Sequence, residues 1–432
     1  MSGLPIGAMK RAAIDSFMVE QGWLLTLGGD TSYSLWGFLN SSYSRPGPEG
    51  EGGGEPDGFS EAGGSMAPSF DSIRARIDAY IAPWLAPLPD GEDCIDPKDN
   101  ASEAATVLGA SGTGGQVLDN GELPRSNEGV ARFLTNIHGS FKAPFYDKYF
   151  SQFSIVSYGI GAACAILESN YAGQGKIWPA AQDDVAEICA STVAALQAKA
   201  DRAASEHTKV ALTVVGAVAG AVVTIASAGT AGPAVASLVL LSSTAATALT
   251  VIEAEAAISG DSYSDILDSF GAALESLNSG ITKQEEALNT MMAGAIDAIG
   301  AHPENFNLDA FSLPMDHDTA ITLTMIKDDS DAISLDMGRV AGALGDAASS
   351  LGSAPATNPT PRDSRIGVTD GTHPTATELY ALTARCLVLT KAEYERGRGL
   401  FEAAAKDFFD ADSEATALVN RLAAAEVLIE NI

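Results

Sequence analysis

Basic residues are scarce in this sequence. Its 432 residues include 25 Lys and Arg against 56 Asp and Glu, which gives a formal net charge of −31. Binding to nucleic acid through counterion release requires clusters of Lys and Arg. The sequence shows no such cluster, so we expect no nucleic-acid partner. The same acidity favours solubility and disfavours adhesion to anionic lipid head groups at neutral pH.

Cysteine is also rare. Cys94, Cys164, Cys189 and Cys386 show no C-x-x-C spacing, which argues against a redox or zinc motif of that kind. Four cysteines in so long a chain do not make a disulfide framework either. Cys164 and Cys189 lie in apolar helical contexts, which favours small buried thiols.

The usual motifs of enzymes and cofactor sites are missing. The glycine-rich stretch 109–115 lacks the Lys-Ser/Thr pair of a P-loop and is interpreted as a flexible loop. The Asp-His-Asp stretch 316–318 is interpreted as a solvated turn. The acidic stretches 328–331 and 410–414 lack the Gly and Glu positions of a calcium loop and are interpreted as exposed helix ends. We therefore expect neither enzymatic activity nor a cofactor or metal ion.

A Sec-type signal peptide is not recognisable. The first apolar stretch is interrupted by Asp15, Glu20 and Gln21, a pattern typical of a short amphipathic helix. The expected location is therefore outside the cell by a Sec-independent route, with the cytoplasm as the alternative.

The most unusual feature that is present is a run of 43 residues without a charged side chain, from Val210 to Ile252. The turn signal at 228–233 divides it into two arms, 210–227 and 234–252. As helices, the arms would each be about 27–29 Å long, close to the thickness of a bilayer's hydrocarbon core. Glycines four residues apart, as at 216 and 220, are typical of closely packed membrane helices. The candidate membrane-hairpin residues are Val210, Val214, Gly216, Gly220, Val223, Gly229, Gly232, Pro233, Leu238, Leu241 and Ile252.

Two interpretations of this run stay open. Its Ala, Gly, Ser and Thr residues gain little on insertion, so the run suits conditional contact with a lipid membrane after a trigger such as lipid, low pH or oligomerisation. In the alternative, the protein is a soluble structural or interaction protein and the hairpin is permanent core. In both cases the hairpin must be shielded in water, because an exposed apolar surface of this size is rare in soluble proteins.

The Ala-rich composition and the spacing of apolar residues predict a mostly α protein, an elongated antiparallel helical bundle with a central apolar helical hairpin. Apolar residues at helical spacing predict helices over 69–85, 179–209 and 253–300, and one aromatic stripe over 129–171. Pro179 is expected in the first turn of its helix, and Gly397 with Gly399 between two C-terminal helices. The predicted organisation is an N-terminal amphipathic segment (1–44), a flexible linker (45–66), a helical bundle (67–352), a second linker (353–374) and C-terminal helices packing on the bundle (375–432).

The stretch 140–198 combines an aromatic-rich helix with an Ala-rich helix that has Asp184-Val185 near its start. It resembles the helical-hairpin region of actinobacterial proteins exported by type VII (ESX) secretion, the Trp-x-Gly superfamily. The sequence has neither the Trp-x-Gly turn nor the Tyr-x-x-x-Asp/Glu export signal of that family. The layout is also similar to that of cytolysin A-type α-helical pore-forming toxins, in which a bundle hides an apolar hairpin. These resemblances imply a non-enzymatic secreted protein that is pore-forming or membrane-associated, with the secretion machinery and further copies of itself as partners.

Overall fold

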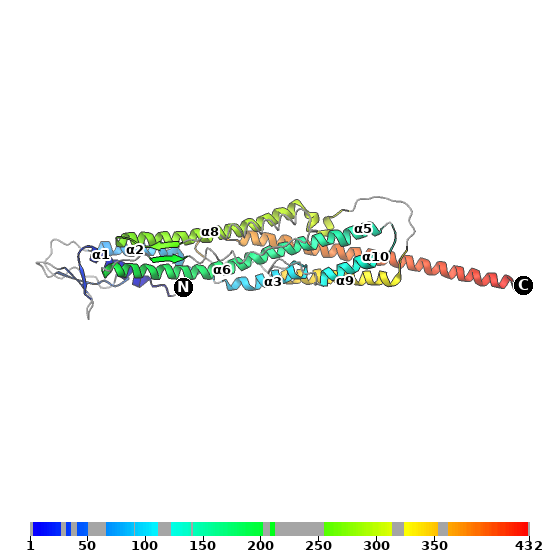
Figure 1. Cartoon of the computed structure of the whole chain (residues 1–432), viewed down its shortest axis with the longest axis horizontal. Helices are drawn as coiled ribbons and strands as arrows, with labels where there is room; N and C mark the ends of the chain where they lie inside the picture. Colours follow the sequence, from blue (N-terminus) through cyan, green and yellow to red (C-terminus); the bar gives the residue numbers. More distant parts are fainter. Residues whose placement is uncertain are drawn as a thin grey trace.

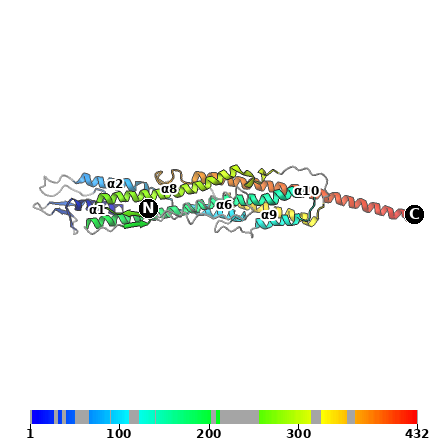
Figure 2. The same cartoon turned by 45° about the horizontal axis from the view of Figure 1, so that its top comes forward.

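The computed structural model describes residues 3–26, 32–35, 41–50, 66–89, 91–110, 122–139, 141–201, 208–211, 255–312, 324–352 and 362–430. This part of the chain is mostly α-helical, which confirms the predicted fold class at that level. The long helices lie lengthwise beside one another, and the C-terminal helix extends beyond the others at one end (Figure 1). Figure 2 shows the same arrangement from a second direction.

Helix α6 (Phe153–Ala200) is the central element. It packs against α1 (Ile6–Glu20), α3 (Ile95–Val107), α8 (Tyr263–Ala301) and α10 (His373–Glu430). Helix α9 (Lys327–Gly352) in turn packs against α10, α3 and α4 (Glu122–Leu134). Helix α2 (Ala67–Leu85) lies against α1 and α8. The core is therefore spread along the length of the molecule rather than gathered at one point.

The predicted apolar stripes explain most of this packing. On α8, the residues Ile266, Phe270, Leu274, Leu277 and Ile281 are all buried. Helix α8 begins with a capping box, in which the Ser262 hydroxyl accepts a hydrogen bond from the Asp265 amide and the Asp265 carboxylate accepts one from the Ser262 amide. The helix predicted over 69–85 is confirmed as α2, which buries Ile73, Ile77 and Ile81.

The single aromatic helix predicted over 129–171 is wrong. Helix α4 ends at Leu134, and α5 (Lys142–Tyr146), a π-helical turn η2 (Asp147–Gln152) and α6 follow after a break. The break contains Gly139 at a φ of 154° and His138, whose backbone exchanges two 3.0 Å hydrogen bonds with Thr324. A long-range contact thus replaces the helical hydrogen bonds that the four-residue spacing suggested.

Proline and glycine also proved poor markers of helix ends. Pro179 lies inside α6, not in its first turn. An internal proline costs about 3 kcal/mol, and the burial of its neighbours Ile177 and Trp178 offsets that cost. Helix α10 runs through Gly397 and Gly399 without a break, so the two C-terminal helices expected there are one. Gly397 is needed for another reason: a Cβ atom there would lie 2.1 Å from Cζ of Tyr149.

Parts of both predicted linkers are structured. Residues 45–50 are held by Arg74, which donates hydrogen bonds to the carbonyls of Gly47 and Pro48, and by Lys10, which pairs with Glu49 at 3.0 Å. Residues 362–372 lie against α8 and contain the buried Ile366. The remaining linker residues, 51–65 and 353–361, lie outside the described part of the chain.

A small antiparallel sheet that we did not predict follows α1. Its strands are β1 (Leu24–Thr26), β2 (Ser32–Leu35) and β3 (Ser41–Ser44), with Tyr33 opposite Tyr43. Both tyrosines are buried, and the Tyr43 ring meets Phe70 of α2 edge to face at 5.7 Å. Together with α1, the sheet makes the N-terminal segment part of the core. The described residues also form three short 3₁₀ turns, η1 (Glu92–Cys94), η4 (Pro303–Asn305) and η5 (Leu308–Ala310).

Candidate functional site

The described segments on either side of the uncharged run lie side by side. Strand β4 (Thr208–Ala211) pairs with β5 (Glu255–Ile258) in antiparallel register, with Thr208 opposite Ile258 and Val210 opposite Ala256. The strands are the green arrows near α6 and α8 in Figure 1. The chain therefore leaves the helices and returns to them at one place, which we call the base of the run.

The strands at the base show that two predicted helices have the wrong bounds. We expected helix over 179–209 and 253–300, and a helical arm beginning at Val210. Instead α6 ends at Ala200, α8 begins at Tyr263, and Val210 lies on a strand. Thr208 and Val210 are β-branched residues, which favour strands when a partner strand is available. The other candidate hairpin residues, Val214 to Ile252, lie outside the described residues.

Helix α1 holds together the helix ends that flank the base. The buried Ser16 hydroxyl donates a 2.6 Å hydrogen bond to the carbonyl of Leu196, near the end of α6. The Glu20 carboxylate accepts a 2.6 Å hydrogen bond from the Tyr263 amide at the start of α8. The Phe17 ring packs edge to face on the Tyr263 ring at 5.4 Å. One amphipathic helix thus contacts both helices that lead to the uncharged run.

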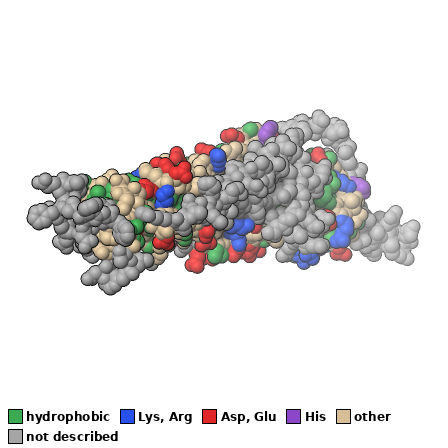
Figure 3. Space-filling model, turned by 60° about the vertical axis from the view of Figure 1, so that its left-hand side comes forward, with side chains coloured by type: hydrophobic (Ala, Val, Ile, Leu, Met, Phe, Trp, Pro, Cys, Tyr) green, Lys and Arg blue, Asp and Glu red, His purple; other side chains and the backbone are tan. Residues whose placement is uncertain are grey.

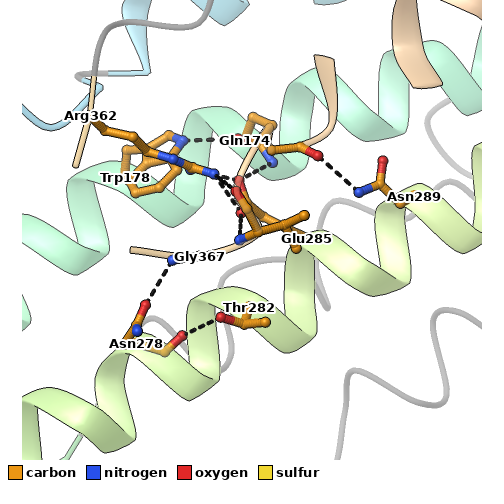
Figure 4. A network of polar contacts seen from close by, with 10 residues as sticks. Gln174, Trp178, Asn278, Thr282, Glu285, Asn289, Arg362 and Gly367 are labelled. Atoms are coloured by element: carbon orange, nitrogen blue, oxygen red, sulfur yellow. Dashed lines mark hydrogen bonds and ion pairs between the residues drawn. The ribbon is translucent and has the colours of Figure 1, made fainter. Parts of the chain in front are cut away.

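Further along α8, a buried carboxylate joins three parts of the chain (Figure 4). Glu285, fully buried, forms an ion pair with Arg362, whose guanidinium also lies 4.5 Å from the ring centre of Trp178 on α6. The Val368 amide donates a 2.8 Å hydrogen bond to the same carboxylate, and Gln174 donates a longer one of 3.4 Å. Because its oxygens are occupied by these donors, the carboxylate is suited to holding the elements together rather than to proton transfer.

A second buried carboxylate lies where α10 crosses the start of α6. Glu393 pairs with Lys148 at 2.7 Å and with Arg396 at 2.5 Å, and it accepts a 3.1 Å hydrogen bond from the Tyr149 hydroxyl. Burial alone would raise the pKa of Glu393, but the hydrogen bonds and charges of Arg396 and Lys148 outweigh it and lower the pKa. Burial, together with the negative charge of Glu393, raises the pKa of Tyr149. Glu393 is therefore a charged structural group at neutral pH.

Thiol chemistry is disfavoured at the buried cysteines. Burial raises the pKa of Cys164 and of Cys189 to about 12, and that of Cys386 to about 11. Since the thiolate is the nucleophile, these thiols are unreactive at neutral pH. In the part of the chain that the structure describes, no group of three His, Cys, Asp or Glu residues is placed to hold a metal ion.

The acidic stretches behave in two ways. Asp328 and Asp329 lie in the first turn of α9, where carboxylates complement the helix dipole, so the predicted helix end at 328–331 is confirmed. The stretch 410–414 lies in the middle of α10 instead, with its side chains exposed. The glycine-rich stretch 109–115 is described only at Gly109 and Ala110, and the stretch 316–318 lies outside the described residues.

One helical stretch among the described residues, Lys142–Ala200, is long and apolar enough to cross a membrane by length and composition. However, 72% of the most apolar 18 residues of this stretch is buried inside the molecule, as in the core helix of a soluble protein. This stretch does not include the uncharged run 210–252, for which the sequence predicts membrane contact.

Sequence reasoning missed a groove between α4 and α9. It has a volume of about 820 Å³ and is lined by Arg125 and Arg132 of α4, Arg339 and Leu335 of α9, and Phe133. Arginines 125 and 132 are seven residues apart, which places them on one face of α4. Arg339 comes from a distant part of the sequence, so only the fold shows that three of the chain's few basic residues share a groove.

Elsewhere the surface charge is mixed. On the face shown in Figure 3, Asp and Glu side chains lie among Lys, Arg and apolar side chains. No protein family, curated protein or solved structure matches the chain.

Proposed function

We propose that this protein is a non-enzymatic, membrane-active helical protein. The long helices form an elongated bundle that shields the uncharged run 210–252 in water, and a trigger exposes the run to a lipid bilayer. In this proposal the run works as a hairpin, because both of its ends are joined to the bundle at the base. Secretion through a type VII pathway belongs to the same proposal and depends on the resemblance of residues 140–198.

The observation that carries the proposal is the pairing of β4 with β5. When the two ends of a segment are fixed side by side, the segment can leave and re-enter a bilayer on the same side. Strand β4 contacts α6, and β5 contacts both α6 and α8, so the base itself is attached to the two helices. A segment with widely separated ends would instead have to pull the bundle apart.

Composition and charge indicate a conditional role. In the middle of a membrane helix, Leu, Ile, Val and Phe each contribute about −0.3 to −0.6 kcal/mol to insertion, and Ala and Gly contribute little. The net charge of −31 opposes approach to an anionic membrane at neutral pH. Acid neutralises carboxylates and weakens that repulsion, so we expect membrane activity to increase at low pH.

Dye release from liposomes tests the proposal. The purified protein should release dye from vesicles between pH 4.5 and 7.5, more strongly at the acid end. The substitution Ala219→Arg places a charge in the first arm and should abolish release, because a charge at the centre of a bilayer is costly. The matched control, Ala75→Arg, adds the same charge at an exposed position of α2 and should release dye like the wild type. Absence of release by the wild type throughout this range would reject the membrane role.

A cross-link at the base tests whether the run must separate there. Val210 and Ala256 face each other in the ladder, so Val210→Cys with Ala256→Cys places two thiols at paired positions. If the strands part during insertion, the oxidised double variant should be inactive and reduction should restore release. If they stay paired, both forms should be active. The single variant Val210→Cys controls for the substitution itself.

The alternative is a soluble structural or interaction protein whose apolar hairpin stays in the core. Its support is that most of the apolar stretch within 142–200 is buried inside the molecule, as a permanently buried hairpin would be. Under this alternative, Ala219→Arg should unfold the protein, since a buried unpaired charge is very costly. Loss of helical content in that variant, with no dye release by the wild type, would select the alternative.

A further inference from the structure

The groove between α4 and α9 has the character of a docking surface. Its apolar wall includes Leu335, which is 56% exposed, and the half-buried Phe133, over whose ring the Arg132 guanidinium lies at 4.5 Å. Its rim carries the exposed Arg125, Arg132 and Arg339. Two carboxylates, Glu128 and Asp336, also line it, and the buried Asp336 pairs with Arg339 at 3.0 Å. Basic residues thus outnumber acidic ones in this groove, although the whole chain has more than twice as many acidic residues as basic ones.

Helix α10 carries a surface of the complementary kind. Beyond Phe409 it continues for 21 further residues to Glu430 (Figure 1). Leu400 and Leu418 are 65% and 54% exposed, and their separation of 18 residues, five helical turns, places them on one face. The exposed Asp407, Asp410 and Glu414 border that face. Beyond Phe409 this face therefore presents Leu418 beside the acidic Asp410 and Glu414, and the groove presents a leucine and a phenylalanine with a basic rim.

The two surfaces cannot meet within one molecule, because α10 is a single helix that runs away from the groove at its end. We propose that the groove binds the α10 tail, defined as residues 410–430, of a second copy of this chain, and that the two copies exchange tails around a two-fold axis. An exchange of this kind uses the same patch on both subunits, as two-fold dimers do.

The dimensions agree with tail exchange. The Lys327 ammonium, at the start of α9, lies 5.9 Å from the ring centre of Phe409, so both residues mark the end of the bundle. A 21-residue tail is about 31 Å long, and Leu335 lies eight residues, about 12 Å, inside that end along α9. If two bundle ends meet, Leu418 of one copy, eight residues beyond Asp410, arrives level with Leu335 of the other.

The charges fall in register as well. Gly129 of α4 lies against Asp336, and Asn136 donates a 3.0 Å hydrogen bond to the Asp329 carboxylate, so α4 runs antiparallel to α9. Arg132 is therefore placed between these two contacts. In the exchanged arrangement the Glu414 carboxylate comes to the same level, where it can pair with the Arg132 guanidinium at the rim.

Sedimentation velocity of the wild type and three variants tests the exchange. The wild type at about 50 μM should sediment as a dimer, and a chain ending at Phe409 as a monomer. Reversing the groove with Arg125→Glu and Arg132→Glu should give a monomer, as should reversing the tail with Asp410→Arg and Glu414→Arg. Circular dichroism should show the same helical content per residue in all forms.

Mixing the variants provides the decisive measurement. Equimolar groove-reversed and tail-reversed chains should form a dimer, since every reversed groove then meets a reversed tail and every native groove a native tail. Raising the salt concentration from 0.05 to 0.5 M should weaken the wild-type dimer by about tenfold or more through screening. A monomeric wild type, or a dimer that survives removal of the tail, overturns the proposal. So does a groove-reversed chain that still dimerises, because the tails would then pair with each other.

Discussion

Glu285 and Arg362, 77 residues apart in the chain, form a buried ion pair with two hydrogen bonds of 2.8 and 2.9 Å. The carboxylate lies on α8 and the guanidinium on the segment that leads into α10 (Figure 4). The exposed fractions of the two side chains are 0% and 9%. A charge buried to this degree is stable only while its partner is present. The pair therefore fixes where the chain enters its last helix.

Removal of the guanidinium should destabilise the protein strongly. We expect Arg362→Ala to lower the free energy of unfolding by about 3–5 kcal/mol, because Glu285 is then left buried without its counter-ion. Urea unfolding followed by circular dichroism measures the difference. The control is Arg365→Ala, which removes an arginine whose side chain is 61% exposed and pairs with Asp363. Equal midpoints for the two variants would contradict the structural role of the buried pair.

The two glycines of α10 should respond in opposite ways to alanine. At Gly397 a Cβ atom would lie 2.1 Å from Cζ of Tyr149, so Gly397→Ala must displace the ring and should cost about 2 kcal/mol. At Gly399 a Cβ atom would meet no heavy atom within 4 Å. There, Gly399→Ala should stabilise the helix by up to about 1 kcal/mol. Thermal unfolding of both variants checks the pair, and a fall in Tm for Gly399→Ala would show that α10 bends there.

The comparison of these glycines shows what sequence could reveal of the fold. Residue types and periodicity predicted the mostly α class, the helix at 69–85 and the buried face of α8, since those features depend on local spacing. Gly397 was interpreted as a helix break because its actual role, contact with Tyr149, involves a residue almost 250 positions away. The break after Leu134 has the same origin, because Thr324 supplies the hydrogen bonds that replace the helix.

The candidate site, like the fold, was predictable from the sequence only in its local features. The absence of charge from Val210 to Ile252 is visible in any reading of the sequence, and so are the two ends of the run. The pairing of the flanking segments as β4 and β5 was not predictable, because Thr208–Ala211 and Glu255–Ile258 are too short to show an alternating pattern. The groove between α4 and α9 could not be predicted, because Arg339 lies near Arg125 and Arg132 only when α9 packs on α4.

Glu168 should make the protein more stable as the pH falls. This α6 carboxyl is buried, its Oε2 atom has no hydrogen-bond partner, and burial raises its pKa above the ordinary 4.5 despite the Ser102 hydrogen bond. A raised pKa means that the folded state binds the proton more tightly than the unfolded state. Its penalty is therefore largest at neutral pH and disappears as the pH falls to about 4.5.

The substitution Glu168→Gln removes that penalty permanently. We expect the variant to be about 1 kcal/mol more stable than the wild type at pH 7, because a neutral amide is less costly to bury than an unpaired carboxylate oxygen. The advantage should shrink at pH 4.5, where the wild-type carboxyl is protonated. Unfolding free energies at the two pH values measure the change. An advantage that is the same at both would mean that Glu168 does not titrate between them.

Glu393 should show the opposite dependence. Despite its burial, the hydrogen bonds and charges of Arg396 and Lys148 lower its pKa, so the folded state holds the carboxylate in its charged form. The stabilisation is complete above the unfolded pKa, near 4.5, and is lost as the pH falls through the lower folded pKa. Glu393→Gln should therefore cost about 2 kcal/mol at pH 7, since Lys148 is left partly unpaired in the interior. The cost should diminish below pH 4.5, where the wild type loses the same charge.

Because Glu168→Gln stabilises and Glu393→Gln destabilises at pH 7, the two substitutions separate the effect of burial from that of a counter-ion. Two substitutions of the same sign at pH 7 would contradict the assignment of one carboxyl as unpaired and the other as paired.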